Sequence, residues 1–489
     1  MNITYQELES EFYLPSLEIL KSENSEIHVD EEEISENKIL ISKTLENFDI
    51  PVLHIESKVG PSVTQYEVTL PDPIRISKIR SILDDISREL GNERLFNARV
   101  FAPIPGKNAI GVEIVNKTRK IVRLKDILGT KEFQESYFSL PIAIGCTLAN
   151  KPYITDLTKM PHLLIIGATG LGKSVLQNVV VTSLLYRRKP NEVKFVIIDP
   201  SRVEFSPYNK IENQYLAKCQ NTKNAIVSDT KEVLDTLNSL CIEMNNRFKL
   251  LHKASSRNFR EYNDIIKLAT THQSLLPKLP YIVVIINDYE DIIMTEGKQI
   301  EKSISILAQK GRSVGIHLII ATGRPNTKII SPAIQANFPA RIAFKVMSKK
   351  QSKVILDRSG AECLTGRGDM LISNNAPLVR VQGAYIEDSE IKQLCDYISE
   401  YTPKGVYLLP EVKVAELEET EEEADPLLKE CAIFLYETKQ ISISSLQRKF
   451  HIGYKRASRI IDQLQKAGVI SSPPRSILLS KEEIEKNFS

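Results

Sequence analysis

One stretch of eight residues restricts the possible folds of this chain more than any other feature. Residues 167–174 read GATGLGKS, which fits G-x-x-x-x-G-K-[ST], the pattern of a loop that surrounds phosphates. The apolar run His162 to Ile166 precedes the loop, and a helical pattern follows it. Such a loop requires a strand before it and a helix after it, because the helix N-terminus presents free N–H groups to the phosphates. The sequence therefore predicts a nucleotide-binding α/β domain.

Each residue type in this loop has a physical role. Glycines let successive backbone N–H groups curl around phosphates, Lys173 is expected to reach the β- and γ-phosphates, and the Ser174 hydroxyl is expected to ligate Mg²⁺. We therefore predict ATP and Mg²⁺ as cofactors. The predicted nucleotide-binding residues are Gly167, Ala168, Thr169, Gly170, Leu171, Gly172, Lys173 and Ser174.

The apolar pattern divides the chain into several units, as its length of 489 residues requires. Residues 1–44 are acidic and are predicted to be a disordered lead, and residues 45–140 mix strand and helix patterns in a small α+β domain. Short β-branched runs alternate with helical stretches over 141–400, which predicts a largely parallel sheet covered on both faces. Residues 401–424 form an acidic linker before a C-terminal unit, 425–489.

Cysteine spacing, apolar runs and charge indicate the compartment and the kind of partner that we expect. The six cysteines are scattered without C-x-x-C pairs, which indicates reduced thiols in a cytoplasmic protein. No run of about 18 apolar residues is present, so no membrane segment is predicted. The formal net charge is only +2, but basic residues outnumber acidic ones in the C-terminal unit, which favours an anionic partner there.

The C-terminal unit has the pattern of a helix-turn-helix followed by a strand-turn-strand wing. In its third helix, Tyr454, Ala457, Ile461 and Leu464 have the spacing of a buried face. Arg and Lys on the outer face of such a helix contact bases and phosphates in the major groove, whereas the alternative is a solvated basic surface. The predicted DNA-binding residues are Lys455, Arg456, Arg459 and Gln463.

Successive blocks of this sequence are similar, in order, to those of the FtsK/SpoIIIE DNA translocases. The resemblance runs from about residue 45 to 475 and includes "PHLLIIGATGLGKSV", "LPYIVVIINDYEDIIM", "LAQKGRSVGIHLIIATGRP" and "SSLQRKFHIGYKRASRIIDQL". It implies an α domain, a RecA-like P-loop NTPase core and a winged-helix γ domain. It also implies a hexameric ring on double-stranded DNA, with a role in chromosome or plasmid segregation at cell division. Relatives usually carry a membrane anchor and a long linker, and we expect neither in this chain.

The chain departs from the family pattern beside the predicted site. Relatives end one strand in Asp-Glu, where this chain has Asn287 and Asp288. They have Gln where it has Gly323, and Lys where it has Ser201. We predict Asn287 and Asp288 as catalytic, Asp288 also as a metal ligand, and hydrolysis as weakened. Three alternatives remain: Asp288 on the metal with Glu290 or Asp291 on the water, a mixed ring, or Asn287 as a strand-end cap.

Ring ATPases need a cation from the neighbouring subunit at the γ-phosphate. The resemblance favours Arg341 as this catalytic residue, with Arg312 and Arg367 as alternatives. Two other functions remain open for the chain. One is a non-hydrolysing DNA-binding ring subunit that nucleotide switches, and the other is a secretion or conjugation ATPase of the same superfamily.

Overall fold

The computed structural model describes residues 12–22, 30–71, 76–92, 98–102, 104, 109–220, 222, 224–268, 276–374, 377–401, 405–412, 425, 427–439, 441–471, 477 and 479. The chain divides into two compact units, Met1–Glu411 and Val412–Ser489. In the described part of the chain, no helix combines the length and apolar character needed to cross a membrane.

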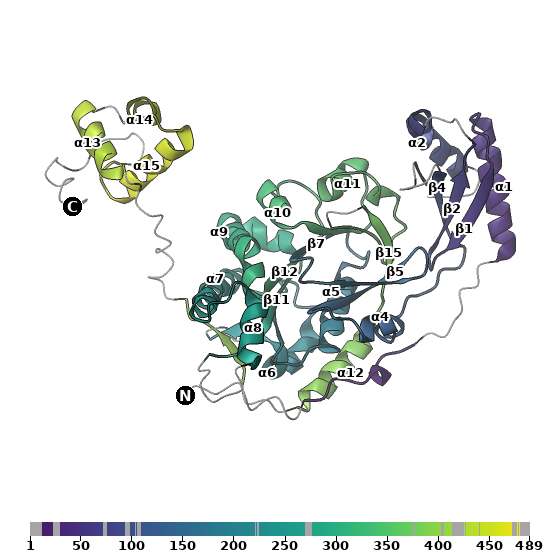
Figure 1. Cartoon of the computed structure of the whole chain (residues 1–489), viewed down its shortest axis with the longest axis horizontal. Coiled ribbons are helices and arrows are strands. Elements are labelled where there is room, and N and C mark those ends of the chain that lie inside the picture. The colour runs from purple at the N-terminus through teal and green to yellow at the C-terminus, as the bar shows by residue number, and fades with distance from the viewer. Residues whose placement is uncertain are drawn as a thin grey trace. The chain divides into compact units, whose positions relative to one another are not determined.

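A ten-stranded sheet forms the centre of the first unit (Figure 1). Six neighbouring strands are parallel, and four antiparallel strands extend the sheet on one side. The parallel strands β7, β8 and β12 are buried along their whole length, because helices cover both faces. In spatial order the strands are β10 (Ile226–Val227), β8 (Val193–Ile198), β11 (Tyr281–Ile286), β12 (Ile316–Thr322), β7 (His162–Ile166), β13 (Ala340–Ala343), β14 (Asp369–Asn374), β15 (Val379–Gly383), β5 (Pro141–Thr147) and β6 (Pro152–Asp156).

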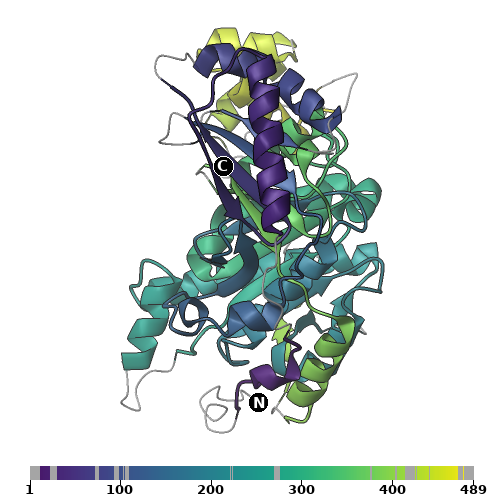
Figure 2. The same cartoon turned by 90° about the vertical axis from the view of Figure 1, so that its right-hand side faces the viewer.

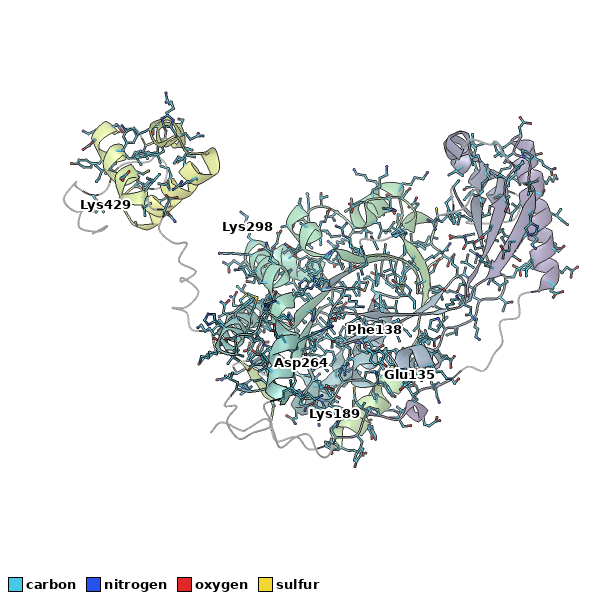
Figure 3. All side chains as sticks on the ribbon, in the orientation of Figure 1. Glu135, Phe138, Lys189, Asp264, Lys298 and Lys429 are labelled. Atoms are coloured by element: carbon cyan, nitrogen blue, oxygen red, sulfur yellow. The ribbon has the colours of Figure 1, made fainter. Side chains whose placement is uncertain are left out.

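Two apolar cores lie on the opposite faces of this sheet, and side chains fill the space between the strands and their helices (Figure 3). Helices α5 (Lys173–Leu185) and α12 (Asp388–Ser399) contribute to one core, and α7 (Thr230–Lys253) and α9 (Tyr289–Lys310) to the other. Shorter helices before and between the strands of this sheet are α3 (Leu124–Leu128), α4 (Lys131–Gln134), η3 (Ser206–Ile211), α6 (Glu212–Tyr215), α8 (Phe259–Leu268), η4 (Gly311–Val314), α10 (Pro332–Asn337), α11 (Lys349–Leu356) and η5 (Ala361–Cys363).

A smaller four-stranded antiparallel sheet precedes the large one, in the order β1 (His54–Val59), β2 (Val63–Thr69), β4 (Ala109–Val115) and β3 (Arg99–Phe101). Helix α1 (Glu31–Asn47) lies along this sheet (Figure 2), and α2 (Ile76–Asn92) contributes to the same core. The predicted mixture of strands and helices is therefore present.

The prediction of a disordered lead over residues 1–44 was wrong for residues 31–44, which are helical. Residues 1–11 and 23–29 lie outside the described residues. Helix α1 begins at Glu31, with Asp30 as its N-cap, and it buries Ile41 and Leu45 against the small sheet. Three of its acidic residues, Glu31, Glu32 and Glu33, lie in the first turn, where the positive end of the helix dipole stabilises them. Upstream, η2 (Leu17–Ile19) is flanked by Phe12 and Leu20, which are buried in the core of the large sheet.

The predicted linker, 401–424, also begins as ordered structure. Strand β16 (Tyr407–Leu409) pairs in parallel with β9 (Ala217–Cys219), and Leu409 is buried. The Tyr407 hydroxyl donates to Glu243 at 3.0 Å and accepts from Arg247 at 3.3 Å. Residues 413–424 lie outside the described residues.

Among its described residues, the second unit contains three helices, α13 (Leu428–Thr438), α14 (Ile443–Phe450) and α15 (Tyr454–Lys466). Ala457, Ile461 and Leu464 of α15 are buried in its core, as the spacing predicts. The Tyr454 side chain lies outside the described part. A single antiparallel bridge joins Ile470 and Ile477, where the wing was predicted, and most of the residues between them are not described.

Candidate nucleotide-binding site and DNA-binding helix

The eight predicted phosphate-binding residues comprise the turn between β7 and α5 and the first two residues of α5. Gly170 and Gly172 have φ values of 76° and 117°, which side chains rarely permit. A Cβ at Gly167 would lie 2.5 Å from the Cβ of Phe344. Glycine is therefore required here by conformation at two positions and by space at a third. The strand, loop and helix have the arrangement that a phosphate-binding loop needs.

Lys173 is the first residue of α5, and it is buried with 7% of its surface exposed. Its ammonium donates to the carbonyl of Ala168 at 3.3 Å. Burial lowers the pKa of Lys173, and the charges of Glu290 and Asp288 oppose that shift. A Cβ built on Gly323 would lie 3.7 Å from Lys173 Nζ and 2.9 Å from Glu290 Oε1, so the lysine lies near the carboxylate of Glu290. Ser174 is half-buried in the same first helical turn.

The phosphate-binding loop rests on the loop before β14. The N–H of Gly368 donates to the carbonyl of Leu171 at 3.0 Å, and the N–H of Gly383 donates to the carbonyl of Gly368 at 2.8 Å. The next residue, Asp369, accepts from Arg380 at 2.7 Å. This series of contacts connects the phosphate-binding loop to the interior of β15.

The parallel strands β8, β11 and β12 end at the same edge of the sheet as β7. Asn287, the residue after β11, is 1% exposed. Its amide nitrogen is 3.2 Å from Asp199 Oδ1 and 3.2 Å from Asp288 Oδ2, and it donates to both. Ser201 donates to the same Asp199 oxygen at 2.6 Å. Asn287 thus joins two carboxylates at the edge where the phosphate-binding loop begins.

Asp288 and Glu290 occupy the start of α9. Asp288 has φ 43° and ψ 52°, a left-handed conformation that costs a residue with a side chain about 1–2 kcal/mol. Burial, followed by the charge of Glu290, raises the pKa of Asp288 above its ordinary value. Glu290 is 8% exposed, and its Oε1 accepts from the N–H of Gly323 at 2.9 Å. The carboxylates, Lys173 and the end of β12 therefore form one site.

This edge of the sheet offers oxygen atoms, which Mg²⁺ prefers as ligands. The predicted donors, Ser174 and Asp288, both lie here. Asn287 Oδ1 and Asp199 Oδ2 are buried without a hydrogen-bond partner among the described residues, so the set fits a hydrated cation. Within the described ranges no group of three or more His, Cys, Asp or Glu side chains could hold a metal by itself. A cation here would therefore depend on phosphate oxygens and water.

The guanidinium of Arg341 is held within its own chain. Four of its N–H groups donate within its own chain, to the carbonyls of Phe338, Ile355 and Gln335 and to the carboxylate of Asp357. This geometry gives Arg341 a structural role that connects α10, β13 and α11, and it disfavours the predicted action in trans. The alternatives Arg312 and Arg367 are both exposed, so either side chain is accessible to a second subunit.

One residue of the predicted outer face of α15, Gln463, was placed wrongly. Gln463 does not project outward, because it is 8% exposed and its side-chain oxygen accepts from the N–H of Asp425. It lies beside Leu464 on the buried face of the helix. Arg456 is partly exposed and donates twice to the buried carboxylate of Asp425, at 2.9 Å each. The side chains of Lys455 and Arg459 lie outside the described part.

Two features of the site were not predicted as such. Glu290 was only an alternative, and its contact with Gly323 joins residues 33 positions apart. The bond from Asn287 to Asp199 joins the ends of two strands. The signal for both was the edge of the parallel sheet, where the ends of neighbouring strands meet near the phosphate-binding loop.

Comparison with protein families gives three matches along the chain. Residues 14–116 match the FtsK alpha domain, residues 123–327 match the FtsK/SpoIIIE family, and residues 422–479 match the Ftsk gamma domain.

Individual relatives are similar over most of this chain. The DNA translocase FtsK of Haemophilus influenzae is 41% identical, with 94% of this chain and 90% of that protein aligned. The DNA translocase SpoIIIE of Bacillus subtilis is 39% identical over 99% of this chain but only 61% of its own length. The chain also spans about 60% of FtsK of Chlorobaculum tepidum, at 38% identity.

A solved structure shares the fold. The conjugation coupling protein TcpA of pCW3 superposes with a TM-score of 0.50 at 21% identity, covering 75% of this chain and 99% of that one. The α/β P-loop fold class is thereby confirmed. Together with the identities over the full chain, these matches show that the chain belongs to the FtsK/SpoIIIE family.

Proposed function

We propose that the chain is an ATP-dependent translocase of double-stranded DNA that acts in chromosome or plasmid segregation. The observation that carries this proposal is buried Lys173, which lies in a phosphate-binding loop beside the carboxylates at the strand ends. The same chain carries a C-terminal unit that matches the Ftsk gamma domain. A nucleotide site and a DNA-binding unit in one chain are what a DNA motor requires. The names of the relatives support this proposal.

The residues of the site have distinct roles in this proposal. N–H groups of the loop hold the phosphate oxygens, and Lys173 contributes positive charge to the β- and γ-phosphates. Mg²⁺, when bound, neutralises charge that develops on the phosphate oxygens. Ser174 and Asp288 are the residues that would hold it, and the amide of Asn287 fixes the position of Asp288. We further propose a homohexameric ring in which an exposed arginine, Arg312 or Arg367, reaches the neighbouring site.

A second candidate is a ring subunit that binds nucleotide as an assembly switch without hydrolysing it. Asn287 favours this function, because a neutral amide stands where a metal-binding carboxylate is expected, and it donates hydrogen bonds to Asp199 and Asp288. A secretion or conjugation ATPase is less well supported, because such a function does not account for the unit that matches the gamma domain.

Steady-state ATP hydrolysis by the full chain, with and without duplex DNA, tests the proposal. We expect hydrolysis that DNA stimulates and that Lys173→Ala abolishes. ATP binding without hydrolysis under either condition would instead favour the switch. Failure of the wild-type chain to bind either ATP or duplex DNA would reject both functions.

A further inference from the structure

We propose that Glu290, supported by Gly323, is the catalytic residue that orients the attacking water in this site. The inference rests on the proposed ATP hydrolysis and names the residue that the chemical step requires. Phosphoryl transfer needs a group that holds the nucleophilic water in line with the γ-phosphate. The structure offers Asp288 and Glu290 for that role, and the two carboxylates differ in what they already bind.

Glu290 presents one oxygen that is fixed and one that is available. Oε1 accepts from the N–H of Gly323 at 2.9 Å, which anchors the carboxylate to the end of β12. Oε2 is buried and has no hydrogen-bond partner among the described residues. The residue as a whole is 8% exposed. A buried carboxylate oxygen without a partner is costly. It therefore indicates a donor that binds during function.

The position of this carboxylate relates it to the phosphate-binding loop. A Cβ built on Gly323 would lie 2.9 Å from Glu290 Oε1, 3.7 Å from Lys173 Nζ and 3.8 Å from the carbonyl oxygen of Gly167. The lysine that is expected to contact the γ-phosphate and the carboxylate of Glu290 thus surround the same point. A water held by Oε2 would lie beside that phosphate.

Gly323 leaves the space that the Glu290 carboxylate occupies. It is not among the glycines with positive φ, so its backbone does not need the conformational freedom of glycine. Any side chain would place a Cβ against Glu290 Oε1 at 2.9 Å, closer than van der Waals contact permits. Glycine at position 323 and glutamate at position 290 therefore form a complementary pair, in which one leaves the space that the other fills.

Asp288 is less suited to hold the water. Its Oδ2 accepts from the Asn287 amide at 3.2 Å, which directs the carboxylate toward the end of β8. The same amide binds Asp199, so Asp288 belongs to the group of oxygens that fits the cation. Asp288 therefore suits the cation, and Glu290 suits the attacking water.

The chemical step uses only ATP and water. The water oxygen forms a bond to the γ-phosphorus while the bond from that phosphorus to the β,γ-bridging oxygen breaks. ADP leaves with the electron pair of that bond, and the proton lost by water passes to the inorganic phosphate. Glu290 Oε2 accepts a hydrogen bond from the water before attack, so it affects turnover far more than ATP affinity.

The test compares single-turnover hydrolysis of ATP by the full chain on duplex DNA with binding of a fluorescent ATP analogue. For Glu290→Gln we expect hydrolysis to fall on the order of 10²-fold, as for loss of one positioned catalytic group, while analogue affinity changes little. Trapping of ADP with aluminium fluoride, which mimics the transferring phosphoryl group, should weaken in parallel. Asp264→Asn is the control, because this exposed carboxylate of α8 has no part in the site, and it should behave as wild type.

A double-mutant cycle tests the pairing with Gly323. Gly323→Ala should displace Glu290 and slow hydrolysis, whereas the same change in a Glu290→Ala background should cost almost nothing further. Equal hydrolysis by wild type and Glu290→Gln would overturn the inference and leave the motor function intact. Faster hydrolysis with tighter binding in Glu290→Gln would also overturn it, since Glu290 would then only repel nucleotide. A wild-type chain that binds ATP but never hydrolyses it would overturn the proposed motor function, and the inference with it.

Discussion

Arg380 of β15 and Glu113 of β4 form a buried ion pair between the large sheet and the small sheet that precedes it. Their side chains are 4% and 3% exposed. Arg380 also donates to Asp369, and Glu113 also accepts from Arg99. One guanidinium therefore connects the α+β domain to the loop that supports the phosphate-binding turn.

Removal of one partner from this pair leaves an uncompensated buried charge. We expect Glu113→Gln to lower the free energy of unfolding by about 3–5 kcal/mol, as measured by urea denaturation. Glu36→Gln is the matched control, because its ion pair with Lys117 is exposed and such pairs contribute little. Equal unfolding midpoints for the two variants would contradict the buried role of Glu113.

The contacts of Asn287 predict that the stability of an Asn287→Asp variant depends on Mg²⁺. In EDTA, Asn287→Asp removes two donated hydrogen bonds and places a third carboxylate beside Asp199 and Asp288. We expect it to destabilise the chain by about 1–3 kcal/mol. With Mg²⁺ and ATP the added charge faces a cation, so thermal stability should recover and turnover should exceed that of wild type. Asn287→Ala should show the same loss in EDTA without the recovery; identical behaviour of the two variants would be evidence against a cation at this edge.

A buried pair of histidines predicts a loss of stability in acid. Burial, and then the charge of His317, lowers the pKa of His162 to about 3, and burial lowers the pKa of His317 to about 4. The ordinary value is 6.5, so below it the unfolded chain binds protons that the folded chain does not.

Stability from this pair is therefore complete above pH 6.5 and falls as the pH drops toward the folded values, by roughly 2 kcal/mol for each histidine at pH 5. Thermal unfolding from pH 7 to pH 5 measures this loss. His317→Gln should make the decline shallower, whereas His252→Gln, a change at an exposed site, should leave it unchanged. A decline that does not differ among the three proteins would rule out the pair as its source.

The contact between Arg456 and Asp425 predicts that Arg456 stabilises the second unit, apart from any contact it makes with DNA. Arg456→Ala leaves the Asp425 carboxylate, which is 1% exposed, without two of its hydrogen bonds. We therefore expect the second unit to melt earlier, and Asp425→Asn added to this variant should restore part of the loss. Arg448→Ala, at an exposed site on α14, is the control for stability. Titration with duplex DNA below the melting range then shows whether Arg456 also contacts DNA.

Arg312 and Arg341 should behave differently in assembly. Arg341→Ala leaves several carbonyl acceptors unpaired and should cost about 1–3 kcal/mol of stability. Arg312→Ala should leave stability unchanged but reduce the DNA-stimulated ATPase, if Arg312 is the residue that acts in trans. Mass photometry with ATP and DNA reports whether each variant still forms rings. A stable Arg341→Ala variant that assembles but does not hydrolyse ATP would instead indicate that Arg341 acts at the γ-phosphate of the neighbouring subunit.

Local pattern was sufficient to predict the parallel sheet, the phosphate-binding loop and the three C-terminal helices. Each depends on residues close in sequence: an apolar run, a glycine at a turn, or apolar positions spaced three and four apart. Gln463 shows the limit of this approach, because its register on α15 allowed either face, and only the packing of Asp425 against it decided the outcome. Composition also misled for α1, where acidic residues of the first turn obscured the buried face formed by Ile41 and Leu45.

The sequence predicted where the candidate site lies in the fold, but it did not predict which hydrogen bonds its side chains make. Glu290 lies in the first turn of a helix, where sequence alone gives an acidic residue a general electrostatic reason to occur. Its actual partner is a backbone N–H at the end of another strand. That contact depends on how α9 packs against the sheet.

The parallel pairing of β16 with β9 has a mechanical consequence for a chain that pulls on DNA. The segment leading to the second unit departs from β16, whose three residues are hydrogen-bonded to a strand of the motor. A pull along β16 loads these hydrogen bonds together in shear, and the hydroxyl of Tyr407 adds contacts to α7. We therefore expect tension from bound DNA to enter the motor at β9 and α7 before the segment detaches, and Tyr407→Phe to lower the rupture force in single-molecule stretching.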